Sequence, residues 1–303
     1  MITRPFGGLR AGRAARHEAC TAWLLLTPAL LLLLLLRIIP AGVAIVQSFY
    51  TSVPGSVIPP KWVGWQNYLD LFEDPDFWAS VWRTLLFAVL VNPLTMLCAL
   101  FLAWLLTRNL ALTGLWRTLA FLPTALPLMG TTVVFGVLMR PEGVINNLLS
   151  LAHLPTSGWF TDVDGALAAL VILSTWTAVG YWMIFLIAAI RDVPRDYYDA
   201  AMLDGAGEVR QFFTVTLPLI QRQLLFVLTA STVWNFIMYA PISALTKGGP
   251  QGSTNFLMYD IITRYYALSS PGSALAEMTV LFVLMGATVW LQFRLLNRMR
   301  SAP

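Results

Sequence analysis

Charged side chains are scarce in this sequence. Of its 303 residues only 11% are charged, whereas 58% are hydrophobic, and the mean hydropathy is +0.71. A water-soluble protein of this length needs a more polar exterior, so the composition excludes a soluble globular enzyme and indicates an integral membrane protein.

Residues that carry chemistry are equally few. The chain has two cysteines, two histidines and two lysines: Cys20 and Cys98, His17 and His153, Lys61 and Lys247. There is no Gly-x-x-x-x-Gly-Lys-Ser/Thr loop to hold ATP phosphates. The histidines lack companion metal ligands, the cysteines do not indicate a disulfide framework, and no nucleophile–base cluster points to an enzyme.

What the sequence does have is long apolar runs. Six of them reach the length of roughly 17–25 residues that a membrane-spanning helix needs, and none shows the alternation of a β-barrel strand. The predicted spans are Thr21–Val46, Trp82–Leu106, Leu119–Leu138, Ala166–Ile190, Gln223–Leu245 and Ser273–Phe293. The first run imitates a secretory signal but is too long for one, so we expect it to stay uncleaved.

Arginines gather on one side of this six-span topology. They lie in the first tail, in the loops after spans two and four, and in the last tail: Arg4, Arg10, Arg13, Arg16, Arg108, Arg117, Arg191, Arg195, Arg210, Arg222, Arg294, Arg298 and Arg300. The positive-inside rule makes this side cytoplasmic. We therefore expect an all-α membrane protein with cytoplasmic tails at 1–20 and 297–303, one membrane domain at 21–296 and a cytoplasmic loop at 191–220. The basic balance reflects topology and does not indicate nucleic-acid binding.

The loop between spans four and five is the most polar part of the chain, with nine charged residues from Arg191 to Arg222. Pro194 suits a helix start, Asp204-Gly205 predicts a break, and Glu208–Thr216 predicts a second helix that Leu217-Pro218 ends. From the pattern alone, this loop is either a docking element for a soluble partner or an amphipathic connector on the lipid surface.

The spacing Asp199-Ala200-Ala201, three residues, Gly205, nine residues, Val215, one residue, Leu217-Pro218 resembles the signature loop of bacterial ABC importer permeases. This family usually has Glu where the chain has Asp199. The resemblance implies a type I importer permease fold and a coupling helix that docks into a separate ATPase. The residues it assigns to coupling are Asp199, Ala200, Ala201, Met202, Leu203, Asp204, Gly205, Ala206, Leu217 and Pro218.

A second match narrows the subfamily. The run from Leu245 to Pro250, followed by Thr254, resembles the external loop of permeases that import carbohydrates and glycerol phosphates. It implies contact with a solute-binding protein through Gly248, Gly249, Pro250 and Thr254. Further similarity at 64–68, 117–123 and 141–146 extends over nearly the whole chain.

The resemblance also implies partners and a place in the cell. A homologous second permease completes the pathway, a homodimeric ATP-binding subunit binds ATP and Mg²⁺, and an extracytoplasmic binding protein delivers the solute. The chain itself is then a multi-pass protein of the bacterial cytoplasmic membrane, holds no cofactor and is not an enzyme. The substrate is a sugar or a glycerol-phosphate compound.

Polar and aromatic residues within the spans are candidates for the substrate pathway, because polar groups facing lipid are costly and sugars stack on aromatic rings. Similarity to the maltose importer favours Tyr181, Ser231 and Asn235, to which proximity adds four more: Trp176, Thr177, Trp234 and Tyr239. The alternative is that Ser231 and Asn235 are contacts between helices and that the aromatics belong to the membrane interface.

Two charges fall inside predicted spans. The alternatives are that they pair with each other, bind the substrate or snorkel to the interface. We expect snorkelling for Glu277, and for Arg37 an anionic substrate group such as a phosphate is a hypothesis. The competing class is a self-sufficient secondary transporter or channel, which would be expected to carry acidic or histidine relays that the spans largely lack.

Overall fold

The computed structural model describes residues 8–51, 59–108 and 111–300, and only the backbone of 8–20 and 296–300. The regular secondary structure of the described residues is helical apart from one short hairpin, in which Tyr50 pairs with Trp62 and Thr51 with Lys61. The elements before the bundle are α1 (Gly8–Leu33), η1 (Leu34–Ile38), α2 (Ile39–Gln47), β1 (Tyr50–Thr51), β2 (Lys61–Trp62) and α3 (Gln66–Glu73). Much of the predicted tails, and the side chain of Cys20, lie outside the described residues.

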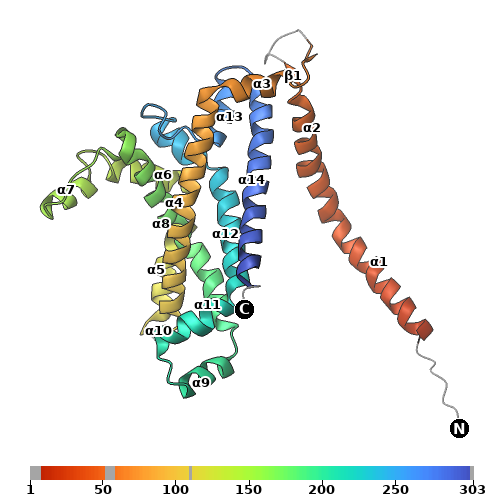
Figure 1. The fold of residues 1–303 in the computed structure, drawn as a ribbon, viewed down its shortest axis with the longest axis vertical. Coiled ribbons are helices and arrows are strands. Elements are labelled where there is room, and N and C mark those ends of the chain that lie inside the picture. Colours follow the sequence, from red (N-terminus) through yellow and green to blue (C-terminus); the bar gives the residue numbers. More distant parts are fainter. Residues whose placement is uncertain (1–7, 52–58, 109–110, 301–303) are drawn as a thin grey trace.

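The bundle follows α3. Its elements are α4 (Pro75–Leu106), α5 (Thr113–Ala125), α6 (Leu128–Leu138), α7 (Val144–Leu151), η2 (Trp159–Thr161), α8 (Val163–Arg191), α9 (Arg195–Leu203), α10 (Glu208–Gln211), η3 (Phe212–Thr216), α11 (Leu217–Leu219), α12 (Gln221–Phe236), η4 (Ile242–Thr246), α13 (Leu257–Tyr266) and α14 (Pro271–Arg300). In Figure 1, α9 lies at the lower end of the bundle and α13 at the upper end. We call these the α9 end and the α13 end.

Four helical stretches are long and apolar enough to cross a membrane: Thr21–Gln47, Pro75–Leu106, Val163–Arg191 and Pro271–Leu295. Two bent pairs raise the count to six if each is one span. The third predicted span is therefore not straight, because α5 and α6 meet at 95°. The fifth ends early, since α12 stops at Phe236.

Helices α4 and α8 form the centre of the bundle, and small residues allow α5 to approach α8 closely. At Gly180 of α8 an added Cβ would collide with the Ala120 carbonyl oxygen and lie 2.8 Å from the Phe121 Cα. Near the α9 end, Ala99 and Ala103 of α4 pack with Met183 and Leu186 of α8 in a fully buried cluster. The core thus binds these helices together around their inner faces.

The first span stands apart from this bundle. Figure 1 shows α1 diverging from α14 towards the α9 end, and the apolar window of Thr21–Gln47 is 0% buried. Such an apolar surface needs lipid or another protein around it.

Candidate functional site

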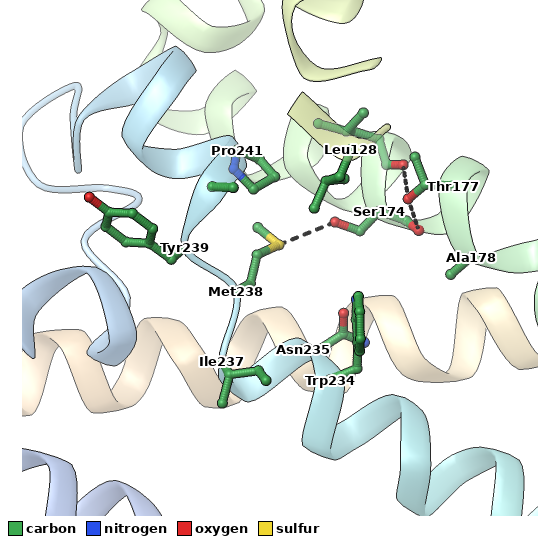
Figure 2. Close-up of a pocket in the computed structure, with 12 residues that line it drawn as sticks. Leu128, Ser174, Thr177, Ala178, Trp234, Asn235, Ile237, Met238, Tyr239 and Pro241 are labelled. Atoms are coloured by element: carbon green, nitrogen blue, oxygen red, sulfur yellow. Dashed lines mark hydrogen bonds between the residues drawn. The ribbon is translucent and has the colours of Figure 1, made fainter. Parts of the chain in front are cut away.

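Two adjoining hollows lie among the broken helices. One, of about 280 Å³, is lined by the end of α12 and the segment after it, facing α8. The other, of about 490 Å³, lies between the α5–α6 bend, α8 and α12. Leu128, Thr177, Ala178 and Trp234 line both, so the two hollows adjoin. Figure 2 shows Trp234 and Asn235 across the first hollow from Leu128.

Proline explains the first break. Pro127 has no N–H to continue the helix and pushes Leu126 into an extended backbone, with ψ at 144°. Non-helical backbone at membrane depth is tolerated where it lines a cavity, and that is where this bend lies. The prolines were visible in the predicted third span, and they are the signal that could have revealed the bend.

The structure brings together five of the seven predicted pathway residues. Thr177, Tyr181, Trp234, Asn235 and Tyr239 line one or both hollows. Trp234 is 66% exposed, so its ring offers a free face.

The other two predicted pathway residues do not line these hollows. Trp176 packs against Phe135, with ring centroids 5.2 Å apart. Ser231 is buried, and its hydroxyl donates to the Leu228 carbonyl of its own helix. Ser231 lies one helical turn before Asn235, and that turn carries it away from the cavity.

Asn235 belongs to a buried polar network that the sequence did not reveal. Its Nδ2 donates to Asn92 Oδ1 of α4 at 2.6 Å. Asn92 in turn donates to Thr232, which also accepts from Gln292 of α14. The network fixes the orientation of Asn235, which joins two helices and also lines the first hollow. Its contact with the substrate stays a prediction. An asparagine inside the second predicted span was the available signal.

The chemistry of the two hollows is that of a neutral ligand. Their polar lining comes from hydroxyl, amide and phenol groups, while none of the lining residues is charged. Thr124 and Thr177 are linked by a hydrogen bond from the Thr124 hydroxyl to the Thr177 carbonyl. Such a surface can exchange hydrogen bonds with hydroxyl groups and stack an apolar sugar face on Trp234.

At the α9 end, the predicted break is present in detail. The Gly205 N–H donates to the Met202 carbonyl and the Ala206 N–H to the Ala201 carbonyl, a Schellman motif. Gly205 has a φ of +74°, which only glycine adopts without strain. This cap leaves Leu203 at the tip of α9, where it is 91% exposed.

The second helix of this loop differs from the prediction. Leu217-Pro218 does not end it: the π-helical turn η3 passes directly into α11, in which Pro218 is the second residue. The helical run from Glu208 continues to Leu219, and α12 follows at an angle of 70°. Tyr198 of α9 is tied to this run through a 2.9 Å hydrogen bond with Thr216.

At the α13 end, the run around Gly248 forms a tight turn. Gly248 has a φ of +81° and is followed by a cis Gly249-Pro250 bond. The Thr254 hydroxyl donates to the Gly249 carbonyl at 2.7 Å, and Thr254 is fully buried. Thr254 therefore shapes the loop from inside and offers no surface for contact with a partner.

Beside that loop lies an ionic cluster around Arg264, which the sequence analysis missed. Arg264 Nε donates to Asp260 at 2.7 Å, and its Nη2 donates to Asp74, the residue that caps α4, at 2.6 Å. Glu277 Oε2 lies 2.9 Å from the same Nε without hydrogen-bond alignment. Glu277 is fully buried, so the prediction that it snorkels is wrong. The Asp260–Arg264 spacing of four residues was a signal for part of this cluster.

Hydrogen bonds in this cluster favour the charged forms of Arg264 and Asp74. Burial opposes the positive charge of Arg264, but its hydrogen bonds to Asp260 and Asp74 outweigh that effect and raise its pKa. Partial burial likewise opposes ionisation of Asp74, yet the bonds from Arg264 and the Asp76 amide hold its pKa below the usual value. Arg37 lies exposed in η1 and makes no ion pair with the described part of the chain.

Similar proteins point in one direction. The sn-glycerol-3-phosphate transport system permease protein UgpA of Pectobacterium atrosepticum is 33% identical over 292 residues, covering 96% of this chain and 98% of that protein. The lactose transport system permease protein LacF of Rhizobium radiobacter is 32% identical, with 92% and 94% covered. The sulfoquinovosyl glycerol transport system permease protein SmoG of Agrobacterium fabrum is 31% identical, with 87% and 86% covered.

The fold has a counterpart among solved structures. A chain of a bacterial ABC transporter involved in the import of the acidic polysaccharide alginate superimposes with a TM-score of 0.76 at 18% identity, covering 95% of this chain and 99% of that one. A family profile described as binding-protein-dependent transport system inner membrane component matches residues 91–301. The chain therefore belongs to this family of inner membrane components.

Proposed function

We propose that the chain is one of two permease subunits of an ATP-driven importer, with six spans and both termini in the cytoplasm. The observation that carries this is α9: a capped helix with an exposed apolar tip, held between two spans at the arginine-rich end. In this proposal α9 docks into a separate homodimeric ATPase, which binds ATP and Mg²⁺, and this chain holds no cofactor. A solute-binding protein docks at the α13 end.

The mechanism follows from the geometry. Closure of the ATPase pair pushes on α9, and the Tyr198–Thr216 contact carries the movement into α11 and α12. The broken ends of α5 and α12 then shift around the two hollows and change which side of the membrane they face. This chain binds and guides the solute, and the energy comes from its partner.

The names of relatives, which are permeases of transport systems for lactose, sulfoquinovosyl glycerol and sn-glycerol 3-phosphate, support a substrate among sugars and glycerol-phosphate compounds. Within that range, we propose a neutral, hydroxyl-bearing solute for this subunit's share of the pathway. The support is that no charged residue lines either hollow, whereas a phosphate dianion needs a cation or a cluster of donors.

A matched pair of tryptophans tests the pathway. Trp234→Leu removes the stacking surface, so we expect the KM for ATP-driven uptake to rise by about tenfold. A loss of this size is expected when one aromatic stacking contact is removed. Trp116→Leu removes an exposed tryptophan on α5 outside the hollows and is the control. Equal kinetics for the two variants would remove Trp234 from the pathway.

Reconstitution distinguishes the importer from a self-sufficient carrier or channel. Liposomes holding this chain with its ATPase, second permease and binding protein should accumulate solute only with ATP inside. Uptake by liposomes that hold this chain alone would contradict the proposal.

A further inference from the structure

A third pocket lies at the α9 end, away from the proposed pathway. It measures about 530 Å³ and lies among the ends of α4 and α8, the start of α9 and the α10–η3 run. Unlike the two hollows, it is lined mostly by polar side chains, among them Arg108, Arg191 and Arg195. Its walls therefore join the membrane spans to the loop that carries α9.

The charges of this pocket do not balance. Glu208 is the one acidic residue of its lining, and it is already paired with Arg108 at 3.0 Å. Arg191 and Arg195 are exposed and form no ion pair with the described residues. Arg117 adds to the positive field, since Arg191 acts on it electrostatically, and its buried Nε has no hydrogen-bond partner within the described chain.

The position of the pocket indicates which anion would reach it. Arg108 stacks over Trp104 of α4, with its Cζ 3.8 Å from the ring centroid. The ring centroids of Trp104 and Phe212 are 5.3 Å apart. Tryptophan at the end of a membrane span is typical of the headgroup level. A lining that combines apolar side chains with two unpaired guanidinium groups matches a lipid, whose acyl chains and phosphate are joined in one molecule.

We propose that this pocket binds the phosphate of an anionic phospholipid headgroup through Arg191 and Arg195. Guanidinium groups bind phosphate oxygens in pairs, and basic pockets between membrane helices are suited to such headgroups. Because the same pocket includes Tyr198 and Thr216, a bound lipid would brace α9 against α8 and η3. That the lipid belongs to the cytoplasmic leaflet rests on the proposed function, whereas binding of the lipid to this pocket does not.

The experiment uses the purified full-length chain in detergent, titrated with phosphatidylglycerol and followed by native mass spectrometry. For Arg191→Gln/Arg195→Gln we expect the affinity for the first lipid to fall by on the order of tenfold. The control is Arg222→Gln/Arg294→Gln, which removes the same charge near the same end but outside the pocket. Unchanged affinity in the first variant, or an equal loss in both, overturns the proposal.

Two further arms identify the occupant. If inorganic phosphate alone raises the melting temperature of the wild type as much as phosphatidylglycerol does, and fails to do so in the Arg191/Arg195 variant, the site takes free phosphate and the lipid assignment is wrong. If assembly with the ATPase expels the lipid, the pocket belongs to that protein and the proposal also fails. Because binding is measured on the isolated chain, a failure of transport leaves its outcome unaffected.

Discussion

Single residues decide the stability of the α13 end. Arg264 forms ion pairs with Asp74, Asp260 and Glu277, which lie in three different parts of the fold. Arg264→Gln would leave Asp260 and Glu277 buried without a cation, and breaking a buried pair in this way costs about 3–5 kcal/mol. We expect a clear fall in the melting temperature of the purified protein. Arg140→Gln, which removes an exposed arginine without an ion pair in the described chain, should leave it unchanged.

Asp74 gives the same cluster a dependence on pH. Its pKa is lower in the folded protein than its usual value, so its contribution to stability is complete above that value and is lost as the pH falls through the lower one. We expect the melting temperature of the wild type to drop on acidification below about pH 4. Asp74→Asn should reduce the slope of that drop, and an identical slope in both proteins would show that Asp74 does not contribute.

At the scale of elements, the end of α9 can be tested through two glycines that are separated by one residue. A Cβ at either Gly205 or Gly207 would have open space, but Gly205 has a φ of +74° and Gly207 a φ of −70°. Gly205→Ala therefore costs about 1 kcal/mol of backbone strain at the cap, while Gly207→Ala does not. We expect solute-stimulated ATP hydrolysis by the complete transporter to fall only in the first variant.

The contact between α5 and α8 offers a second test. Gly180→Ala would drive a methyl group into the Ala120 carbonyl, so the two helices must separate. We expect a loss of thermal stability of about 1–3 kcal/mol. Gly130→Ala in α6 meets nothing within 4 Å and is the control. Equal stability of the two variants would mean that the helices part at little cost.

The sequence predicted these elements unevenly. The long apolar runs of α4, α8 and α14 were identified because continuous hydrophobicity is a local property, and the cap at Gly205 was identified because glycine has a local signature. The bend at Pro127 and the early end of α12 were missed, because hydrophobicity alone does not show where within an apolar run a helix bends or ends. Ser231 and Asn235 could not be distinguished beforehand, because they share one face of α12 and only the packing of the neighbouring helices decides at which turn the hollow begins.

For the molecule as a whole, the proposed orientation puts the α9 end in the cytoplasm and can be tested by labelling. Arg222 belongs to the first turn of α12, directly after α11 at the α9 end, whereas the exposed Arg140 follows α6, which Figure 1 shows well above α9. In a background with Cys20 and Cys98 replaced by serine, we expect an impermeant maleimide added to intact cells to label Arg140→Cys and not Arg222→Cys. Labelling of both or the reverse pattern would contradict the proposed orientation.

Helix α4 is held by opposite charges at both of its tips: Asp74 meets Arg264 at one, and Arg108 meets Glu208 at the other. Between them runs one uninterrupted helix of 32 residues, a rod of roughly 48 Å at 1.5 Å per residue. A displacement of the α13 end that arrives through Asn255 and Asp260 can thus be passed to the α9 end without involving the hollows. A contact made at one end of the bundle can therefore shift the other end while the hollows keep their shape.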